Sequence, residues 1–206
     1  MFLVIKMEIR QIRLGEIKSN CYVVSHQGKA MIIDPGFESD LVIDYLYENQ
    51  LVPELIYVTH GHFDHCGGVK QLKEYYNIVV YAPKKDEIWM NDSAYNRWLY
   101  PIPVDHWVTK NDKIFFQGIE FTILETPGHS DGSTALYHAP YLFGGDTLFY
   151  QSIGRTDLPF ASFDKIKKSI LKLYELPNQT TIYPGHGRPT TIAHEKQYNP
   201  FVKGKL

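Results

Sequence analysis

Apolar residues along the chain fall into two alternating patterns. Short runs rich in β-branched and aromatic residues, bounded by turn residues, are typical of strands. We expect strands from the start of the chain through Ile12 and at residues 21–24, 30–33, 55–59, 78–81, 114–116, 118–124, 133–138, 141–143 and 180–183. Between them, apolar residues recur at helical spacing at residues 39–49, 69–76, 84–91, 162–173 and 192–197. Strands and helices that alternate in this way predict an α/β architecture.

One predicted helix has both a start signal and an apolar face. Ser162 can act as its N-cap. The apolar residues that follow, Phe163, Ile166, Ile170 and Leu173, fall on one stripe. The pattern predicts that this stripe packs against the rest of the protein.

The segment 89–107 is unusually rich in aromatic residues. It holds Trp89, Tyr95, Trp98, Tyr100 and Trp107, interrupted by Pro101, Pro103 and Asp105. These rings could form an aromatic lip beside a substrate groove. Alternatively, the segment is a long connection whose aromatic side chains pack onto the core, which is the interpretation we favour.

Length and composition narrow the class of protein. With 206 residues, the chain is long enough for one domain (1–206) with two halves, roughly 1–110 and 111–206. An aromatic content of 14% excludes a disordered or collagen-like chain. No apolar run approaches the roughly 18 residues of a membrane-spanning helix, so we expect no membrane partner.

Charge and cysteine content point to a cytoplasmic protein without a nucleic-acid partner. The net charge of −2 does not suggest the basic face that nucleic acids require. The apolar start of the chain breaks at Lys6 and no small-residue cleavage site follows, so we do not interpret it as a signal peptide. Two cysteines, Cys21 and Cys66, make no disulfide framework, and we expect reduced thiols.

Metal-competent side chains are concentrated directly after the strand predicted at residues 55–59. Within six residues the chain carries His60, His62, Asp64 and His65. The two histidines at alternate positions of an extended segment can point the same way. The Asp and His that follow lie on the turn into the next helix and can face a second point nearby. The ends of strands in an open α/β sheet are where ligands bind.

Three further fragments place a polar residue among turn residues after a strand. They are residues 126–130 with His129, 144–147 with Asp146, and 183–187 with His186. Five imidazoles and two carboxylates without thiolate suit zinc, iron or manganese. Seven ligands exceed the four of a structural zinc site, so the sequence indicates two metal ions, or one ion with vacant ligands. A single histidine of this kind could be an ordinary core or surface residue, but the pattern of seven argues against that.

The remaining candidates are assigned no chemical role. We expect His26, His106, His138 and His194 not to bind metal. Cys66 is interpreted as a small buried residue and not as a nucleophile. No Gly-x-Ser-x-Gly motif is present to support a serine nucleophile.

These motifs resemble the metallo-β-lactamase superfamily. The motif H-x-H-x-D-H at residues 60–65, followed by P-G-H-S, G-G-D-T-L-F and P-G-H-G, is similar to that family over nearly the whole chain. Residues 153–157, 190–192 and 199–201 resemble the glyoxalase II (hydroxyacylglutathione hydrolase)-like group of small bacterial metallo-hydrolases. The resemblance implies an α/β fold of the αββα type, with two mixed sheets face to face and helices on the outer faces.

The resemblance also implies a division of the ligands between two divalent metal ions, with zinc expected first and iron or manganese as alternatives. One ion would be held by His60, His62 and His129, the other by Asp64, His65 and His186, with Asp146 bridging. Asp64 and Asp146 would act in catalysis together with a metal-bound hydroxide, since bound metal lowers the pKa of water to about 7. Asp34 resembles an acid that steadies a histidine ligand, or it only forms the Asp-Pro-Gly turn.

The chain departs from glyoxalase II in the substrate region. We expect the chain to lack the C-terminal glutathione-binding helical region of those enzymes. A Lys and a Tyr that contact glutathione there correspond by position to Arg155 and Asp157. Arg155 could bind a substrate carboxylate, or it could pair with Asp157 and shape the loop.

The function implied is hydrolysis of hydroxyacyl thioesters, with a small-molecule thioester or ester as substrate and no prediction of oligomeric state. The main alternative is a persulfide dioxygenase-like enzyme, in which a single iron is held by His60, His129 and Asp146. A lactone or other ester hydrolase on the same centre is a further alternative. Subclass B1 β-lactamases resemble the chain less, because they place Arg where His65 stands and Cys where Asp146 stands. A non-catalytic module is disfavoured because every ligand position is filled.

Overall fold

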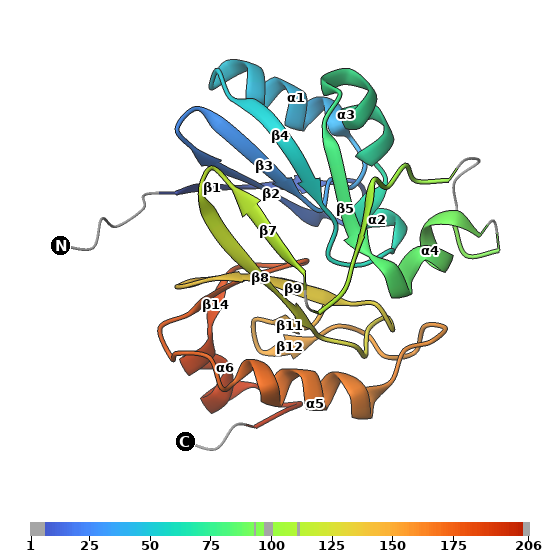
Figure 1. The fold of residues 1–206 in the computed structure, drawn as a ribbon. Coiled ribbons are helices and arrows are strands. Elements are labelled where there is room, and N and C mark those ends of the chain that lie inside the picture. Colours follow the sequence, from blue (N-terminus) through green and yellow to red (C-terminus); the bar gives the residue numbers. More distant parts are fainter. Residues whose placement is uncertain (1–6, 93, 97–100, 111, 204–206) are drawn as a thin grey trace.

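Two six-stranded sheets face each other, and helices cover their outer sides (Figure 1). The computed structural model describes residues 7–92, 94–96, 101–110 and 112–203. The first sheet contains β1 (Glu8–Leu14), β2 (Ser19–His26), β3 (Lys29–Ile33), β4 (Val52–Tyr57), β5 (Val79–Pro83) and β6 (His106–Val108), in that order. The first three strands are antiparallel and the rest are parallel, so the sheet is mixed.

The second sheet is built from the later part of the chain. In spatial order it contains β14 (Thr190–Thr191), β13 (Thr181–Pro184), β10 (Tyr141–Gly145), β9 (Thr134–His138), β8 (Ile119–Glu125) and β7 (Lys113–Phe116). β10 and β13 are parallel and the other pairs antiparallel. A separate two-stranded ribbon pairs β11 (Leu148–Phe149) with β12 (Ser152–Ile153).

The helices occupy the two outer layers and the loops at one end. They are α1 (Ser39–Glu48), α2 (Phe63–Cys66), α3 (Val69–Tyr76), the short 3₁₀ helix η1 (Lys84–Asp86), α4 (Glu87–Asn91), α5 (Phe163–Leu173) and α6 (Ile192–Tyr198). Figure 1 shows α1 and α3 on the outer side of the first sheet and α5 and α6 on that of the second. The predicted α/β fold of two mixed sheets with outer helices is therefore confirmed.

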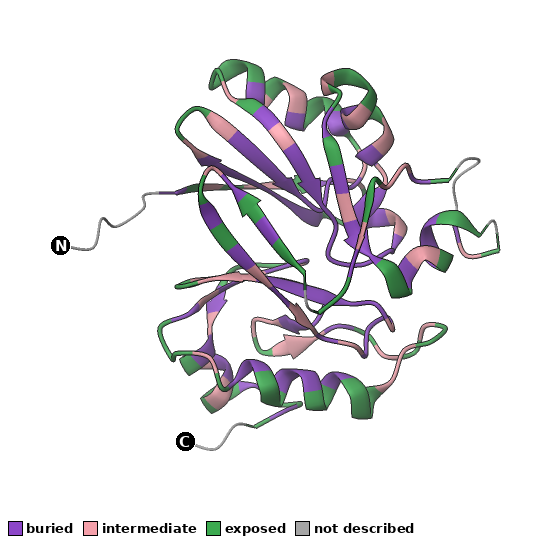
Figure 2. Ribbon diagram, viewed as in Figure 1, coloured by how far each residue is buried: buried purple, intermediate pink, exposed green. Residues whose placement is uncertain are grey.

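Strand alternation explains why both faces of each sheet are buried. Val23 and Ile32 point to the helices α1 and α3, whereas Val24 and Ile33 point to the second sheet. Phe121 of the second sheet packs in the same central layer. Figure 2 shows the resulting buried strands between exposed helix faces. The central layer fixes the two sheets relative to each other, and with them the loops that carry the site.

The sequence pattern located most elements within a few residues. The N-cap of α5 is confirmed, since Ser162 Oγ accepts a hydrogen bond from the N–H of Lys165 at 3.4 Å. Ile166, Ile170 and Leu173 are buried as expected, but Phe163 is 43% exposed and the prediction for it is wrong. It is the first residue of the helix, beyond the reach of the core beneath the next turns. The strand expected over residues 1–6 lies outside the described residues.

None of the helices in the described part of the chain has the length and apolar character that crossing a lipid bilayer requires.

Candidate metal centre

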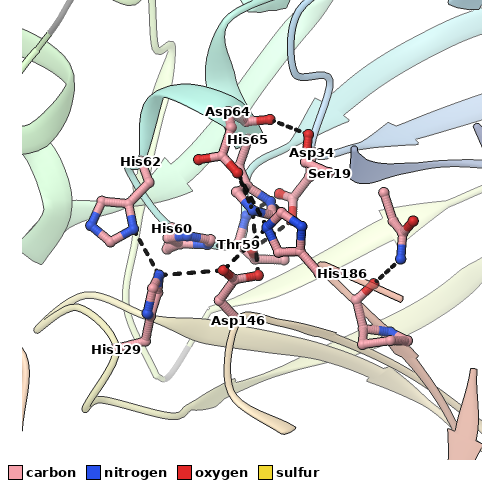
Figure 3. A network of polar contacts seen from close by, with 12 residues as sticks. Ser19, Asp34, Thr59, His60, His62, Asp64, His65, His129, Asp146 and His186 are labelled. Atoms are coloured by element: carbon pink, nitrogen blue, oxygen red, sulfur yellow. Dashed lines mark hydrogen bonds and ion pairs between the residues drawn. The ribbon is translucent and has the colours of Figure 1, made fainter. Parts of the chain in front are cut away.

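Four segments that follow strands converge at one end of the sandwich and bring all seven predicted ligands together (Figure 3). His60 and His62 lie between β4 and α2, and α2 itself carries Asp64 and His65. His129, Asp146 and His186 follow β8, β10 and β13, respectively. β3 runs parallel to β4, and β10 runs parallel to β13, so the ends of these strands meet at the same edge.

Three imidazoles form the first ligand group, which consists of His60, His62 and His129. Their rings lie 4.5–4.9 Å apart between centroids and meet edge to face. Nδ1 of His62 and Nε2 of His129 face each other at 2.8 Å. All three side chains are buried. Three buried nitrogen donors that converge on one point form a site for a metal ion that prefers imidazole.

Asp64, His65 and His186 form the second ligand group. Oδ2 of Asp64 lies 3.2 Å from Nε2 of both histidines. Asp146 lies between the two groups, with Oδ1 3.3 Å from Nε2 of His65 and Oδ2 3.4 Å from Nε2 of His129. Asp146 is the only one of the seven residues whose carboxylate contacts both groups at these distances.

Unsatisfied buried atoms indicate that the centre fits a metal. Five buried side-chain polar atoms of the described residues lack a hydrogen-bond partner, and four belong to this centre. They are the Nε2 atoms of His60, His62 and His65 and Oδ1 of Asp146. A buried polar atom without a partner is costly, and a coordinated ion removes that cost. The donor set of imidazoles and carboxylates is one that zinc, iron and manganese accept.

Surrounding oxygen atoms orient three of the imidazoles. Nδ1 of His60 lies 3.0 Å from Oγ1 of Thr59, and Nδ1 of His129 lies 2.9 Å from the carbonyl oxygen of Arg155. Nδ1 of His65 lies 3.1 Å from Oδ2 of Asp34. A ring nitrogen that donates its proton to such an oxygen leaves Nε2 free to bind a metal.

Asp34 combines both interpretations considered from the sequence. Its backbone has a positive φ of 53°, as a turn residue can. Its carboxylate also accepts hydrogen bonds from the N–H and the hydroxyl of Thr59, each at 2.7 Å, besides meeting His65. Thr59 thus connects the two groups through Asp34 and His60, a role that the sequence did not reveal because it depends on contacts across the fold.

Histidine pKa values shift in opposite directions in the two groups. In the first group, burial and the neighbouring imidazoles lower the pKa of His60 and bring that of His62 to about 3. Burial acts in the same direction at His65 and His186, but the carboxylates beside them outweigh it and raise the pKa of both. The imidazolium forms of these histidines in turn hold the pKa of Asp64 well below its usual range despite burial.

The remaining candidates have other surroundings. His106 stacks on Tyr81, His194 stacks on Tyr150, and Nδ1 of His138 lies 2.9 Å from a backbone oxygen. Neither these three nor His26 belongs to a metal-competent group in the part of the chain that the structure describes.

Cys66 has the surroundings of a structural residue. Its thiol is fully buried and lies 3.3 Å from the carbonyl oxygen of His62. Burial raises its pKa, and a thiol that stays protonated is a poor nucleophile. The geometry agrees with the structural role predicted for this residue.

A pocket of about 600 Å³ opens beside the centre. Its metal-facing side is formed by the ligand residues, and its wall includes Ile17, Phe63, Trp89, Tyr95, Leu158 and Pro159. The rings of Trp89, Tyr95 and Phe160 contact one another with centroid distances of 5.3–5.9 Å. Trp89 also meets the ring of His62 edge to face at 4.4 Å. An apolar wall beside polar donors is typical of a small-molecule site.

This pocket divides the aromatic segment 89–107. Trp107 packs against the core of the first layer, as favoured from the sequence. Trp89 is buried, as that interpretation expects, but both Trp89 and Tyr95 also line the pocket, as the alternative of an aromatic lip expects. η1 and α4 pack against the loop of residues 60–62 and bring the aromatic side chains to the pocket. This contact joins distant parts of the chain, so the local sequence pattern does not reveal it. Trp98 and Tyr100 lie outside the described residues.

Arg155 forms the local ion pair considered from the sequence. Its Nε and Nη2 atoms donate to the two carboxylate oxygens of Asp157, each at 2.7 Å. The Arg155 hydrogen bonds lower the pKa of Asp157 to about 2. Arg155 also lines the pocket. The charge of its guanidinium is therefore already paired beside the pocket.

A family comparison agrees with this geometry. The model of the family described as "Metallo-beta-lactamase superfamily" matches residues 14–186, which include every ligand residue. The chain belongs to the metallo-β-lactamase superfamily. Proteins with this fold bind metal ions, and the superfamily consists of metallo-hydrolases and related enzymes.

Two curated relatives from this superfamily match almost end to end. One, named "Probable metallo-hydrolase YqgX", from Bacillus subtilis, is 34% identical over 96% of this chain and 99% of its own. The other, hydroxyacylglutathione hydrolase GloC from Haemophilus influenzae, is 33% identical over 97% of this chain and 100% of its own.

Solved structures of superfamily members show the same fold. The BLEG-1 B3 metallo-β-lactamase is 38% identical, with a TM-score of 0.89 over 96% of this chain and 100% of that one. TTHA1623, solved in a di-iron-bound form, is 34% identical, with a TM-score of 0.84 over 94% and 100%. ETHE1 from Myxococcus xanthus is 27% identical, with a TM-score of 0.82 over 94% and 84%.

Proposed function

We propose that the protein is a metal-dependent hydrolase of hydroxyacyl thioesters with two divalent metal ions per chain. The observation that carries this proposal is the position of Asp146, whose two carboxylate oxygens contact the first and the second ligand group. A carboxylate that contacts both groups can bridge two ions that lie close together. The relative solved in a di-iron-bound form supports two ions, and zinc is the first choice on donor chemistry.

The residues have distinct parts in this centre. His60, His62 and His129 would hold one ion, Asp64, His65 and His186 the other, and Asp146 would bridge them. When bound, such ions supply a nucleophilic water at neutral pH and polarise the substrate carbonyl. Asp64 keeps its negative charge because the neighbouring imidazoles lower its pKa.

The pocket positions the substrate. Its apolar wall of Trp89 and Tyr95 lies beside His62, where it excludes water and orients the acyl group or its thiol carrier. A departing thiolate is a good leaving group and needs little help from a protonated side chain. The name of the relative GloC, a hydroxyacylglutathione hydrolase, supports hydroxyacyl thioesters as the substrate class. The thiol carrier used by this protein is left open in the proposal.

A persulfide dioxygenase is the second candidate. ETHE1, a persulfide dioxygenase, shares the fold at 27% identity. His60, His129 and Asp146 form the two-histidine, one-carboxylate set that non-haem iron oxygenases use. That arrangement leaves the second ligand group without a function, whereas the two-ion hydrolase uses all seven residues.

An activity panel distinguishes the candidates. The protein is purified without chelators and assayed for thiol release from lactoyl thioesters and for oxygen uptake with a persulfide. We expect thiol release, loss of it in His186→Ala, and full activity in the matched control His194→Ala. Oxygen uptake that survives His186→Ala would instead establish the dioxygenase.

A further inference from the structure

A further buried carboxylate, that of Asp86, forms hydrogen bonds with residues next to the first ligand group. Asp86 is the last residue of η1, directly before α4, and is fully buried. Its Oδ2 accepts hydrogen bonds from the N–H of Gly61 at 2.9 Å and from the hydroxyl of Ser130 at 2.6 Å. Its Oδ1 accepts one from the N–H of Gly132 at 2.7 Å. One carboxylate thus binds three donors from two distant parts of the chain.

Each donor lies next to a metal-facing residue or on its loop. Gly61 separates His60 from His62, and Ser130 directly follows His129. Gly132 belongs to the same loop as Ser130. The side chain of Asp86 therefore ties the loop after β4 to the loop after β8, which together supply every member of the first group.

Two glycines permit this close approach. A Cβ atom added to Gly132 would lie 2.5 Å from Cγ of Asp86. A Cβ atom added to Gly61 would lie 2.8 Å from the carbonyl oxygen of Asp86 and 2.6 Å from Cβ of Trp89. Real Cβ atoms do not approach so closely, so both loops need glycine at these positions for Asp86 to reach their backbones.

We propose that Asp86 is a positioning residue for the first metal ion, holding His60, His62 and His129 in the geometry that binds it. It is not one of the ligand side chains and acts through the N–H groups of Gly61 and Gly132 and the hydroxyl of Ser130. Asp34 is the corresponding carboxylate for the second group, where it meets His65 and Thr59 directly. The two carboxylates thus divide the centre between them.

The same residue links the pocket wall to the metal. Asp86 immediately precedes α4, and Trp89 in that helix meets His62 edge to face. A carboxylate that fixes the start of this helix to the ligand loops also fixes the distance between the wall and the first ion. This role of Asp86 rests on the proposed metal centre, and metal binding can be measured without knowing the substrate.

The test measures the affinity of each ion in Asp86→Asn. Asn has the same shape but one acceptor oxygen, so either Gly61 or Gly132 loses the partner of its N–H. We expect the affinity of one ion to fall about 10–100-fold, the usual effect of removing an outer partner of a ligand. Zinc retained against increasing chelator is measured by elemental mass spectrometry, with circular dichroism to verify folding.

Variants in which only one ligand group is complete show which of the two ions Asp86→Asn affects. In His186→Ala, where the first group alone is complete, adding Asp86→Asn weakens the remaining ion. In His129→Ala, where the second group alone is complete, it leaves the remaining ion unchanged. The matched variant Asp34→Asn, which alters the partner of His65, weakens the remaining ion in His129→Ala. Equal losses in both backgrounds, or no loss in either, would overturn the proposal.

A milder variant covers the case in which Asp86→Asn does not fold. Ser130→Ala keeps the carboxylate and removes one of its three hydrogen bonds. A several-fold loss of zinc affinity confined to the His186→Ala background supports the proposal. Unchanged affinity in that background contradicts it.

Discussion

The first and second ligand groups differ in charge and in access to solvent. The first consists of three buried imidazoles, and burial lowers the pKa of His60 and His62. The second includes the carboxylate of Asp64, and its His186 side chain is 27% exposed. Nearby carboxylates raise the pKa of His65 and His186. The first group therefore consists of buried imidazoles alone, and the second combines imidazoles with a carboxylate.

The difference between the two groups changes how strongly protons compete with a metal ion at each of them. A proton competes weakly for His60 and His62, because burial and the neighbouring imidazoles lower the pKa of both. A proton competes strongly for His65 and His186, because the carboxylates beside them raise the pKa of both. We expect the second ion to be the exchangeable one, and the following predictions test that contrast.

The largest effect is expected where the two groups meet. Asp146→Asn removes the charge that contacts both groups, so thioester hydrolysis should fall at least about 10²–10³-fold, the scale of losing one charge-stabilising group. Zinc content should fall as well. Asp105→Asn, which changes a carboxylate paired with Lys73 outside the centre, is the matched control. Near-normal activity in Asp146→Asn would show that the groups do not share this carboxylate.

The pH dependence of metal binding separates the groups. Metal binds the deprotonated imidazole, so a lowered pKa extends binding to lower pH and a raised pKa restricts it. His186→Ala, left with the first group, should retain zinc at a lower pH than His129→Ala, left with the second. Metal content after equilibration between about pH 5 and 8 measures this. Identical profiles would contradict the contrast.

Thr59 should affect both groups to a moderate extent. Thr59→Val removes the hydroxyl that donates to Asp34 and lies 3.0 Å from Nδ1 of His60. We expect the affinity of each ion to fall about 10-fold. Thr122→Val in β8 serves as the control. A loss confined to one ion would mean that this hydroxyl supports one group alone.

The pocket wall is expected to change substrate binding more than turnover. Tyr95→Ala removes ring contacts with Trp89 and Phe160, each worth up to about 1.5 kcal/mol. KM for a lactoyl thioester should rise about 3–10-fold with little change in kcat. Tyr47→Ala, whose ring is exposed on α1, should change neither value. A fall in kcat at constant KM would indicate a catalytic role for the wall.

The smallest effect is expected at the exposed ion pair. Asp157→Asn frees Arg155, which should lower KM for a glutathione thioester by a few-fold and leave KM for an uncharged thioester unchanged. Thermal stability should not change measurably, since exposed pairs contribute little. An equal change for both substrates would show that Arg155 does not bind a carboxylate.

The sequence predicted the sheets and the ligand set for a physical reason. Long strands carry an apolar pattern, and the ends of parallel strands gather whatever polar residues follow them. The strands of two or three residues, β6, β11, β12 and β14, carry too little pattern to be predicted. The roles of Thr59 and Asp86 could not be predicted either, because they depend on residues 25 or more positions away.

In the proposed centre, seven ligand residues hold two metal ions. The most direct measurement is metal stoichiometry by elemental mass spectrometry, on protein purified without chelators from cells supplied with zinc and iron. We expect close to two ions per chain in the unaltered protein and close to one in His186→Ala. One iron per chain, unchanged by His186→Ala, would contradict this expectation.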